Sequence, residues 1–525
     1  MFLKCRSISL NVKCKFLLLF TLSCFFSPSL CLAEDAQQAV SQYEFVLSFN
    51  ITHNVISGDF LDRSGNELLI VGEKDKDVKV IALYGFDSKE ATFILLDEYI
   101  LPENIVVFDT ITDINGKENV VLLSSTRLSL INFDAKYAHP ESKADLREHI
   151  IQDDFASIYA NPNPQFIAKK NLVRDVNGDG YDDIVISGFS DLIILLQTEV
   201  DGLSQFVVQN LPINSIIDMG KEQIAFVERP IFSVDANFDQ MLDIVLAGEG
   251  ELQVYKQLVD HTFSNIPEIV SLPMNVSGIP WWYLRDSDGE TADQSDLHHQ
   301  KLEYIMDING DGHFDLVIMN TESSGLLDRQ NRYDIHFGKL VCGKLIFGEK
   351  PDTQISSEGT LTGLELLDVD EDGLQEVFVV SFDIGLTQII GALISGKIKQ
   401  DVFFFSLNED GKYNPRPNFT KRVNLNFSLT KGRVGEPVID IADLDGDGLM
   451  EFILSASTDK LAIHAGIAKA KRFISKPESY KVELPKEGSM LTTGYIFSKL
   501  KKDIVIRYGR QDDLSLRRKI LVLSF

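Results

Sequence analysis

The stretch Asp175-Val-Asn-Gly-Asp-Gly-Tyr-Asp-Asp-Ile-Val-Ile186 predicts a cation-binding loop that runs directly into a β-strand. Side-chain oxygens stand at its positions 1, 3, 5 and 9, which are Asp175, Asn177, Asp179 and Asp183. Gly180, at position 6, permits a sharp left-handed bend that turns these oxygens inward, and Tyr181 can add its backbone carbonyl. Hard oxygen ligands on a tight turn favour Ca²⁺ over the smaller Mg²⁺, which demands a stricter octahedron. The apolar residues 184–186 indicate a buried strand.

The same pattern occurs four more times, so the chain is a repeat. The further copies begin at Asp235, Asp307, Asp368 and Asp443, and each has acidic or amide residues at positions 1, 3, 5 and 9. In the copy at Asp235, Phe238 and Gln240 stand at the two positions where the pattern has glycine. Asp, Asn and Gly are good turn formers without any metal. However, chance does not explain one spacing five times, and carboxylates this close repel one another unless a cation neutralises them.

Three further copies are eroded, and we expect no metal in them. The copy from Asp59 to Glu67 keeps both ends but lacks the acidic middle, and the copy at Asp113 has Lys117 where the third ligand should stand. A remnant at 498–506 keeps only the junction between loop and strand. The copies begin about 50 to 75 residues apart, a period typical of propeller blades with four strands each.

The strand segments of the last unit predict how a ring of blades closes. That unit has three of them, Met490–Ile496, Asp503–Tyr508 and Lys519–Phe525, while Tyr43–Ile51 is a strand that no other unit uses. Together the four segments complete a blade and pair both free edges, which would otherwise invite aggregation. We therefore predict an all-β fold, a β-propeller of eight four-stranded blades, with seven blades as the alternative. In the third unit, residues 168–173 are expected to form the first strand.

Composition restricts the partners. The chain has 525 residues, with 50 Lys+Arg against 78 Asp+Glu and a net charge of −28. This acidity disfavours nucleic acid and anionic membranes as partners, since both require a basic surface.

The beginning of the chain indicates export. Residues 1–33 have the pattern of a cleaved secretory signal, with a basic start, an apolar segment at 16–26 and Ala33 at the cleavage site. That apolar segment is too short to span a bilayer, so no transmembrane segment remains after cleavage, and an uncleaved anchor is the alternative. Cys342 is the only cysteine after the leader, so the propeller at 34–525 has no disulfide. We expect a secreted protein, or one in the periplasm or cell envelope of a bacterium.

The repeated unit resembles the FG-GAP/VCBS repeat family, whose fold is similar to the N-terminal β-propeller of integrin α-subunits. The resemblance covers about residues 43–525, although the Phe-Gly and Gly-Ala-Pro signatures that name the family are missing as a regular set. An EF-hand is excluded, because it needs an oxygen ligand at position 12 of the loop, where Ile186 stands here.

The resemblance implies about five structural Ca²⁺ sites, each with the ligands of positions 1, 3, 5, 7 and 9. These ligands are Asp175, Asn177, Asp179, Tyr181 and Asp183; Asp235, Asn237, Asp239, Met241 and Asp243; Asp307, Asn309, Asp311, His313 and Asp315; Asp368, Asp370, Asp372, Leu374 and Glu376; and Asp443, Asp445, Asp447, Leu449 and Glu451.

A long insertion between the fourth and fifth units is the best candidate for ligand recognition. It contains Trp281, Trp282, Tyr283 and Arg285, and aromatic faces beside polar groups suit a sugar ring or a protein contact. The alternative is that the tryptophans anchor the loop. We expect a calcium-stabilised binding, adhesion or scaffold module for a protein or glycan, without catalytic residues. A calcium-dependent polysaccharide lyase or hydrolase remains open, with Arg285, His298 and His299 as its weak candidates.

Overall fold

The computed structural model describes residues 40–61, 63–74, 78–133, 147–161, 163–325, 328–357, 359–382, 391, 395–408, 410–428, 432–468 and 472–525. The predicted signal peptide at 1–33 and Asp62 lie outside these residues. In the described part, no helix has the length and hydropathy that crossing a membrane requires. Val40–Phe525 forms one structural unit, and the description below concerns this unit.

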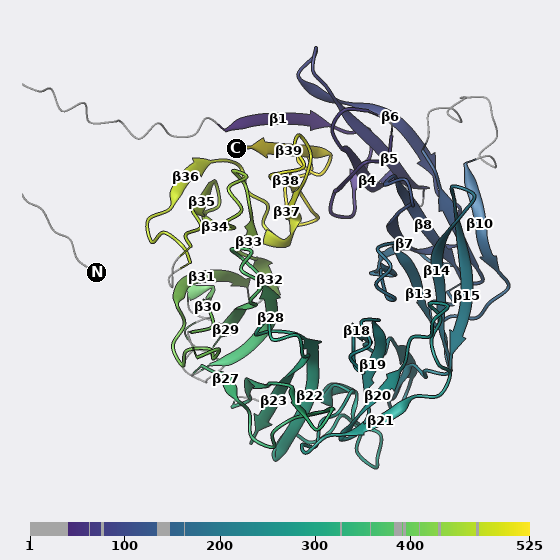
Figure 1. Cartoon of the computed structure of the whole chain (residues 1–525). Helices are drawn as coiled ribbons and strands as arrows, with labels where there is room; N and C mark the ends of the chain where they lie inside the picture. Colours follow the sequence, from purple (N-terminus) through teal and green to yellow (C-terminus); the bar gives the residue numbers. More distant parts are fainter. Residues whose placement is uncertain are drawn as a thin grey trace, which may run out of the picture. The chain divides into compact units, whose positions relative to one another are not determined.

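Eight sheets of four or five strands make up the described part of this unit, and each is one blade of a ring (Figure 1). Blade 1 contains β2 (Asn50–Ile51), β3 (Ile56–Gly58), β4 (Glu67–Lys74), β5 (Val78–Asp87) and β6 (Thr92–Ile100). Blade 2 contains β7 (Ile105–Thr112), β8 (Glu118–Ser124), β9 (Arg127–Ile131), β10 (Glu148–Asp153) and the short β11 (Ala168–Lys169). Blade 3 contains β12 (Val173–Arg174), β13 (Asp183–Ser187), β14 (Leu192–Val200) and β15 (Leu203–Leu211). Blade 4 contains β18 (Phe232–Val234), β19 (Asp243–Ala247), β20 (Glu251–Tyr255) and β21 (Glu268–Ser271).

The second half of the ring follows the same plan. Blade 5 contains β22 (Leu297–Met306), β23 (Asp315–Ser323), β24 (Gln330–His336) and β27 (Thr353–Ile355). Blade 6 contains β28 (Thr360–Leu367), β29 (Glu376–Phe382), β30 (Lys397–Phe405), β31 (Phe419–Ser428) and β32 (Gly432–Gly435). Blade 7 contains β33 (Ile439–Ala442), β34 (Glu451–Ser457), β35 (Lys460–His464) and β36 (Glu478–Lys481). Blade 8 contains β37 (Leu491–Gly494), β38 (Asp503–Arg507), β39 (Lys519–Ser524) and β1 (Ser41–Val46).

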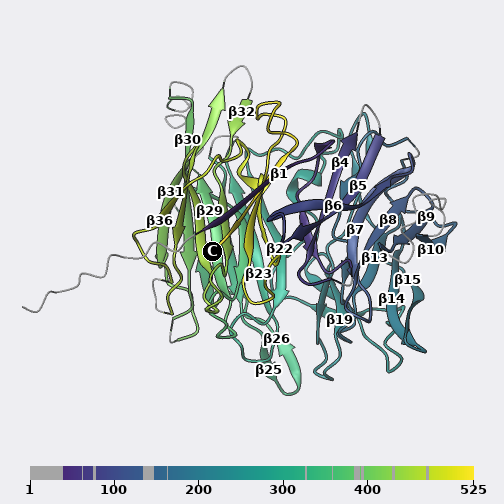
Figure 2. The same cartoon turned by 90° about the horizontal axis from the view of Figure 1, so that it is seen from above.

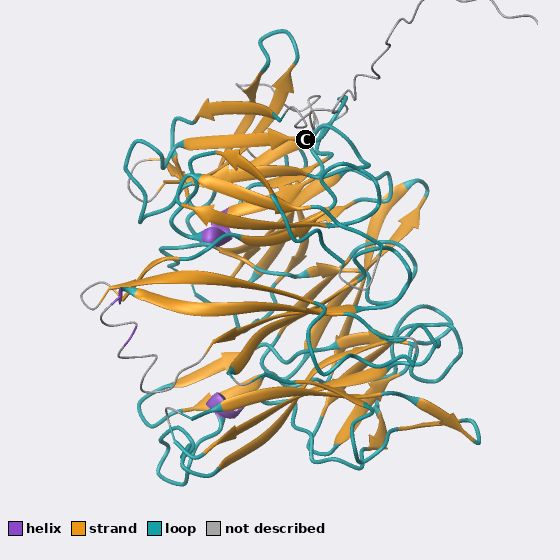
Figure 3. Ribbon diagram, turned by 90° about the vertical axis from the view of Figure 1, so that its left-hand side faces the viewer, coloured by secondary structure: helices purple, strands orange, loops and turns teal. Residues whose placement is uncertain are grey.

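Among the described residues, two hairpins and two helical turns stand outside the blades. The hairpins are β16–β17 (Ile216–Met219 and Ile224–Val227) and β25–β26 (Lys339–Val341 and Lys344–Ile346). The helical turns are η3 (Trp281–Tyr283) and η4 (Gly488–Met490). Figure 3 shows a molecule built almost wholly of strands and loops. The prediction of an all-β propeller with eight blades is confirmed, and seven blades are excluded.

The ring closes as the strand segments predicted. β1 pairs antiparallel with β39, from Ser41 opposite Ser524 to Val46 opposite Lys519, and Figure 1 shows the two strands side by side. Eight apolar clusters in the described residues each join two neighbouring blades. The cluster of Phe45 with Leu68 joins blade 8 to blade 1. The burial of apolar surface that drives folding is therefore continuous around the ring.

Two strand predictions are wrong in their bounds. The predicted closing strand 43–51 divides between two blades, because Ser41–Val46 forms β1 in blade 8 whereas Asn50–Ile51 forms β2, which pairs with β4 of blade 1. The segment 168–173 does not form a single first strand of blade 3. Ala168 and Lys169 form β11, which pairs in parallel with β7 of blade 2, and the first strand of blade 3 begins at Val173. The chain crosses from one blade to the next within this segment, so its residues divide between two sheets.

The antiparallel order of the strands gives the ring two different faces. Connections from the first to the second strand, and from the third to the fourth, lie at one end of the strands, which we call the loop face. Connections between blades lie at the other end, the opposite face. The hairpin β25–β26 belongs to the loop face, and Figure 2 shows that it extends beyond the strand ends. The insertion that contains η3 connects blade 4 to blade 5 and belongs to the opposite face.

Candidate metal loops and the pocket beside Trp282

In each of the eight described blades, an acidic residue begins the second strand, directly after the first loop, if β2 and β3 of blade 1, which both pair with β4, are counted as one strand. These residues are Glu67, Glu118, Asp183, Asp243, Asp315, Glu376, Glu451 and Asp503. Each is paired with the last residue before its loop, as Asp183 is with Arg174 and Glu118 is with Thr112. The blade 2 loop is therefore 113–117, shorter than its counterpart at 175–182. This deletion is why spacing alone did not align Glu118 with the others.

This acidic residue, position 9 of the loop, connects the loop to the sheet through backbone N–H groups. Asp183 is fully buried; its Oδ2 accepts a hydrogen bond from the Val176 N–H (3.0 Å) and its Oδ1 accepts one from the Gln197 N–H (2.8 Å). Burial raises the pKa of Asp183 to about 7, and the charges of Asp179 and Asp175 add to the shift. Position 9 therefore has a structural role that needs no metal, beside the ligand role predicted for it.

The other side-chain oxygens fold back onto the backbone of their own loop. Asp175 accepts hydrogen bonds from the N–H groups of Gly178 (2.7 Å) and Gly180 (2.9 Å). In all five intact copies the N–H of position 7 donates to the carboxylate of position 5, at 2.8 to 2.9 Å. The donors are Tyr181, Met241, His313, Leu374 and Leu449. The five predicted ligand sets thus have one common loop geometry.

The copy at Asp235 has this geometry without the glycines. Phe238 and Gln240 lie at φ values of +64° and +70°, where Gly178 and Gly180 lie at +74° and +86°. A residue with a Cβ is strained in this left-handed region, by about 1–2 kcal/mol. The blade 4 loop therefore carries strain that its counterpart in blade 3 avoids.

Relief of that strain gives a testable result. We expect Gln240→Gly to stabilise the protein by about 0.5–1 kcal/mol, because the removed strain exceeds the extra chain entropy that glycine brings to the unfolded state. Urea unfolding measures the change. Gln330→Gly is the matched control: Gln330 is also exposed but is not among the positive-φ residues, so its replacement should destabilise the protein. Equal effects of both changes would contradict the strain.

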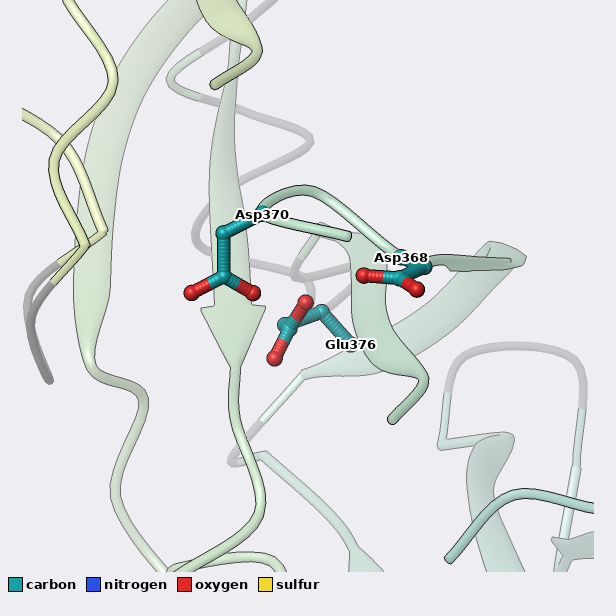
Figure 4. A group of neighbouring side chains, drawn as sticks. All are labelled: Asp368, Asp370 and Glu376. Atoms are coloured by element: carbon teal, nitrogen blue, oxygen red, sulfur yellow. The ribbon is translucent and has the colours of Figure 1, made fainter. Parts of the chain in front are cut away.

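Two loops bring three carboxylates close enough to share an ion. Asp368, Asp370 and Glu376 of blade 6 each offer an oxygen within 4.8 Å of the others', and Figure 4 shows these carboxylates converging.

The blade 7 loop has the same arrangement in Asp443, Asp445 and Glu451. No described residue forms an ion pair with this second cluster. Burial and the neighbouring Asp447 and Asp443 raise the pKa of Asp445. Three hard oxygen donors without an internal counter-charge fit a Ca²⁺ ion.

The remaining intact loops have an amide at position 3, namely Asn177, Asn237 and Asn309. In the blade 3 loop the Asn177 side chain is itself buried and donates to Asp179 Oδ2 (3.0 Å). These loops offer oxygen donors with less negative charge than the two carboxylate clusters.

A pocket of about 360 Å³ lies between blades 5 and 6, beside the insertion. Trp281 and Trp282 line it; the first is buried at 8% exposure and the second is exposed at 41%. The guanidinium of Arg329 lies 5.2 Å from the Trp281 ring. Lys301 and Glu303, which also line the pocket, form an ion pair at 2.7 Å.

Asn331 adds an unsatisfied polar atom to this pocket. Its Nδ2 donates to the Leu361 carbonyl (3.0 Å), while its Oδ1 is buried and has no hydrogen-bond partner. A buried acceptor without a donor costs free energy, so a donor supplied by a ligand would be favourable. Lys301, Glu303 and Asn331 were not predicted as site residues, because only the pairing of β22 and β24 with β23 brings them near the tryptophans.

The other two residues predicted for ligand binding do not line the pocket. Arg285 forms an ion pair with Asp218 on β16 (2.5 Å) and donates to the Thr291 hydroxyl (2.7 Å), so it fastens the insertion to the hairpin. The Tyr283 ring is tilted by 56° against the Trp282 ring, with the ring centroids 6.0 Å apart. Arg285 and Trp281 therefore anchor the insertion, and Trp282 is the residue whose ring is exposed at the pocket.

The three residues considered for catalysis are not gathered in one pocket. His298 and His299 line a second pocket, of about 430 Å³, and Arg285 is not among its lining residues. The Nε2 atom of His299 lies at hydrogen-bond distance, 2.8 Å, from the Ile279 carbonyl, and burial lowers the pKa of this histidine.

No family model matches the chain, and no curated protein matches it either. Among solved structures, the chain is similar to a lectin of Agrocybe aegerita whose recognition of non-reducing terminal N-acetylglucosamine has been described, at 14% identity and a TM-score of 0.40, covering 84% of this chain and 94% of the lectin. It is also similar to the WD40 domain of SCAP from fission yeast, at 12% identity and a TM-score of 0.36, covering 93% and 98% of the two chains. At these scores neither likeness indicates a family or a ligand for this chain.

Proposed function

We propose that this protein is a secreted, calcium-stabilised β-propeller that binds a glycan at the pocket beside Trp282. The observation that carries the proposal is the meeting of an exposed indole with a buried, unsatisfied Asn331 Oδ1 in one pocket. A pyranose has an apolar face that stacks on an aromatic ring and hydroxyl groups that donate hydrogen bonds. Trp282 can stack on the apolar face of the sugar, and Asn331 Oδ1 can accept a hydrogen bond from one of its hydroxyl groups.

Calcium has a separate role in this proposal. The loops at Asp175, Asp235, Asp307 and Asp443 each take one Ca²⁺, and the oxygen donors described above are its ligands. They belong to the loop face, whereas the insertion belongs to the opposite face. The ion therefore stabilises the blades and does not touch the glycan.

The proposal is tested by binding to a glycan array with the wild-type protein and two variants. Trp282→Ala should weaken binding at least about 10-fold, because a buried aromatic contact contributes about 2 kcal/mol or more. Tyr495→Ala is the matched control, since Tyr495 is another aromatic residue of similar exposure, 42% against 41%, outside the pocket. Binding that survives in Trp282→Ala would overturn this site.

The same experiment separates the alternative functions. New reducing or unsaturated ends in bound polysaccharide would indicate a calcium-dependent hydrolase or lyase on this propeller. Failure of the wild-type protein to bind any glycan, together with capture of a defined protein that Trp282→Ala no longer binds, would indicate a protein-binding or scaffold role.

A further inference from the structure

We infer that the side chain of Arg472 occupies the cation position of the blade 6 loop, so that this loop folds without a metal ion. The inference rests on the proposed calcium binding in the other intact loops, and it reduces the number of ions from five to four. Arg472 comes from blade 7, in the turn between β35 and β36, and thus reaches into the loop of the preceding blade.

Arg472 contacts three of the five predicted ligands of the blade 6 loop. Its Nη1 donates to Asp370 Oδ2, its Nη2 donates to Glu376 Oε1 (2.7 Å), and Nη2 lies 3.7 Å from Asp372 Oδ2. Its Nε donates to the Ser406 hydroxyl (3.0 Å). The guanidinium thus contacts positions 3, 5 and 9 of the loop and also Ser406, the residue that follows the third strand of blade 6.

Because these side chains are buried, the loop cannot hold the arginine and a metal ion together. The side chain of Arg472 is 11% exposed, that of Asp370 is 9% exposed and that of Glu376 is fully buried. A guanidinium is always charged and donates in a planar fork that matches carboxylates. A divalent cation on the same oxygens would lie within a few ångströms of that charge, in surroundings where water screens repulsion poorly. The loop therefore holds either the arginine or a metal.

The backbone of Arg472 has a strained conformation. Its φ is +56°, in the left-handed region that disfavours residues with a Cβ. Such strain persists only where the surroundings determine the conformation. Here the contacts of the guanidinium with the blade 6 loop fix the conformation.

The equivalent position in another blade shows that a basic residue alone is not enough. Isolated bridges place Phe473 of blade 7 and Tyr413 of blade 6 at matching turns, so Lys412 corresponds to Arg472. Lys412 is exposed, and among the described residues no ion pair joins it to the loop at Asp307.

A second loop shows the same arrangement with a lysine. Lys117 belongs to the blade 2 loop, and its Nζ lies 2.6 Å from Asp59 Oδ1 and 2.9 Å from the Leu61 carbonyl in blade 1. These two oxygens come from positions 1 and 3 of an eroded loop for which the sequence predicts no metal. In both cases the cation comes from the next blade along the chain. Each side chain therefore places a positive charge among the oxygens of a loop and joins two blades.

Counting bound ions tests the inference. Native mass spectrometry after equilibration with Ca²⁺ compares the wild-type protein, Arg472→Gln and Arg422→Gln. Arg422 is the matched control, because it also pairs with an aspartate, Asp401, but is 62% exposed and its partner is not a predicted loop ligand. We expect Arg472→Gln to bind one ion more than the wild type, because it frees the oxygens of three carboxylates. The buried Asp370 Oδ1, which has no hydrogen-bond partner, adds a further donor for the ion. Arg422→Gln should bind the same number as the wild type.

Two aspartate variants keep the test decisive if Arg472→Gln does not fold. Asp370→Asn in the wild-type background should leave the ion count unchanged, whereas Asp445→Asn should lower it by one. Loss of an ion in Asp370→Asn would overturn the inference, as would equal counts in Arg472→Gln and the wild type. A wild-type protein without ions and an Arg472→Gln variant with one would support the arginine and contradict calcium in the other loops. No ion in either protein would overturn both.

Discussion

Chelation of calcium is expected to lower the melting temperature of this protein by about 10 °C. At an ion concentration of about 100 times Kd, each site contributes roughly 2.7 kcal/mol to the folded state. Four sites then contribute roughly 11 kcal/mol, and an unfolding entropy of roughly 2.1 cal/mol/K per residue converts this to a shift near 10 °C for a unit of this size. Differential scanning calorimetry in Ca²⁺ and in excess chelator measures the shift.

Two controls separate calcium binding from a general effect of the chelator. Mg²⁺ at the same concentration should restore little of the lost stability, because the loops offer no strict octahedron. Asp445→Asn should reduce the shift by about a quarter, one site of the proposed four. Asp513→Asn, at an exposed aspartate outside the loops, should not change it. Identical melting curves with and without chelator would rule out structural calcium.

Replacement of Glu67 by alanine is expected to destabilise the protein by about 3 kcal/mol, because it leaves two buried N–H groups without an acceptor. Glu67 is 1% exposed, and its Oε2 accepts hydrogen bonds from the backbone N–H groups of Phe60 and Leu61, both at 3.0 Å. It begins the second strand of blade 1, where no metal is predicted. The loss should therefore be the same in calcium and in chelator, as measured by urea unfolding.

Glu90→Ala provides the comparison for this change, because Glu90 is exposed on a turn of the same blade. Its stability should remain within about 0.5 kcal/mol of the wild type, as for most surface substitutions. If the effect of Glu67→Ala disappeared in chelator, the acidic residue would be a metal ligand in blade 1, and its proposed structural role would be wrong.

Local spacing was sufficient to predict the fold. In the five intact copies position 9 begins an apolar strand, and the eroded copies kept enough of the pattern for the units to be counted. The unused segment 43–51 indicated where the ring closes. The prediction failed at 168–173, because pairing with β7 or β13 depends on neighbours that the local sequence does not name. The alternation of apolar and polar residues predicts a strand, but it does not predict the sheet that the strand joins.

The candidate sites were predictable only where their residues are close in sequence. Arg472 lies 96 residues from Glu376, and Arg285 lies 67 residues from Asp218, so no motif links either pair. Asn331 likewise could not be predicted as a pocket residue, because the sequence does not show which buried amide lacks a hydrogen-bond partner. Such contacts arise from the arrangement of the blades around the ring.

The pairing of β1 with β39 has a consequence for the order of events in folding. Ser41–Val46 is made at the start of synthesis of this unit, but its partner strand Lys519–Ser524 is made about 470 residues later. At about 5–20 residues per second, translation leaves β1 without its partner strand for roughly half a minute or more. Contacts this distant in sequence also slow folding. Blade 8 is therefore the last to assemble, and until then the strand is exposed to capture by chaperones or by another copy of the chain.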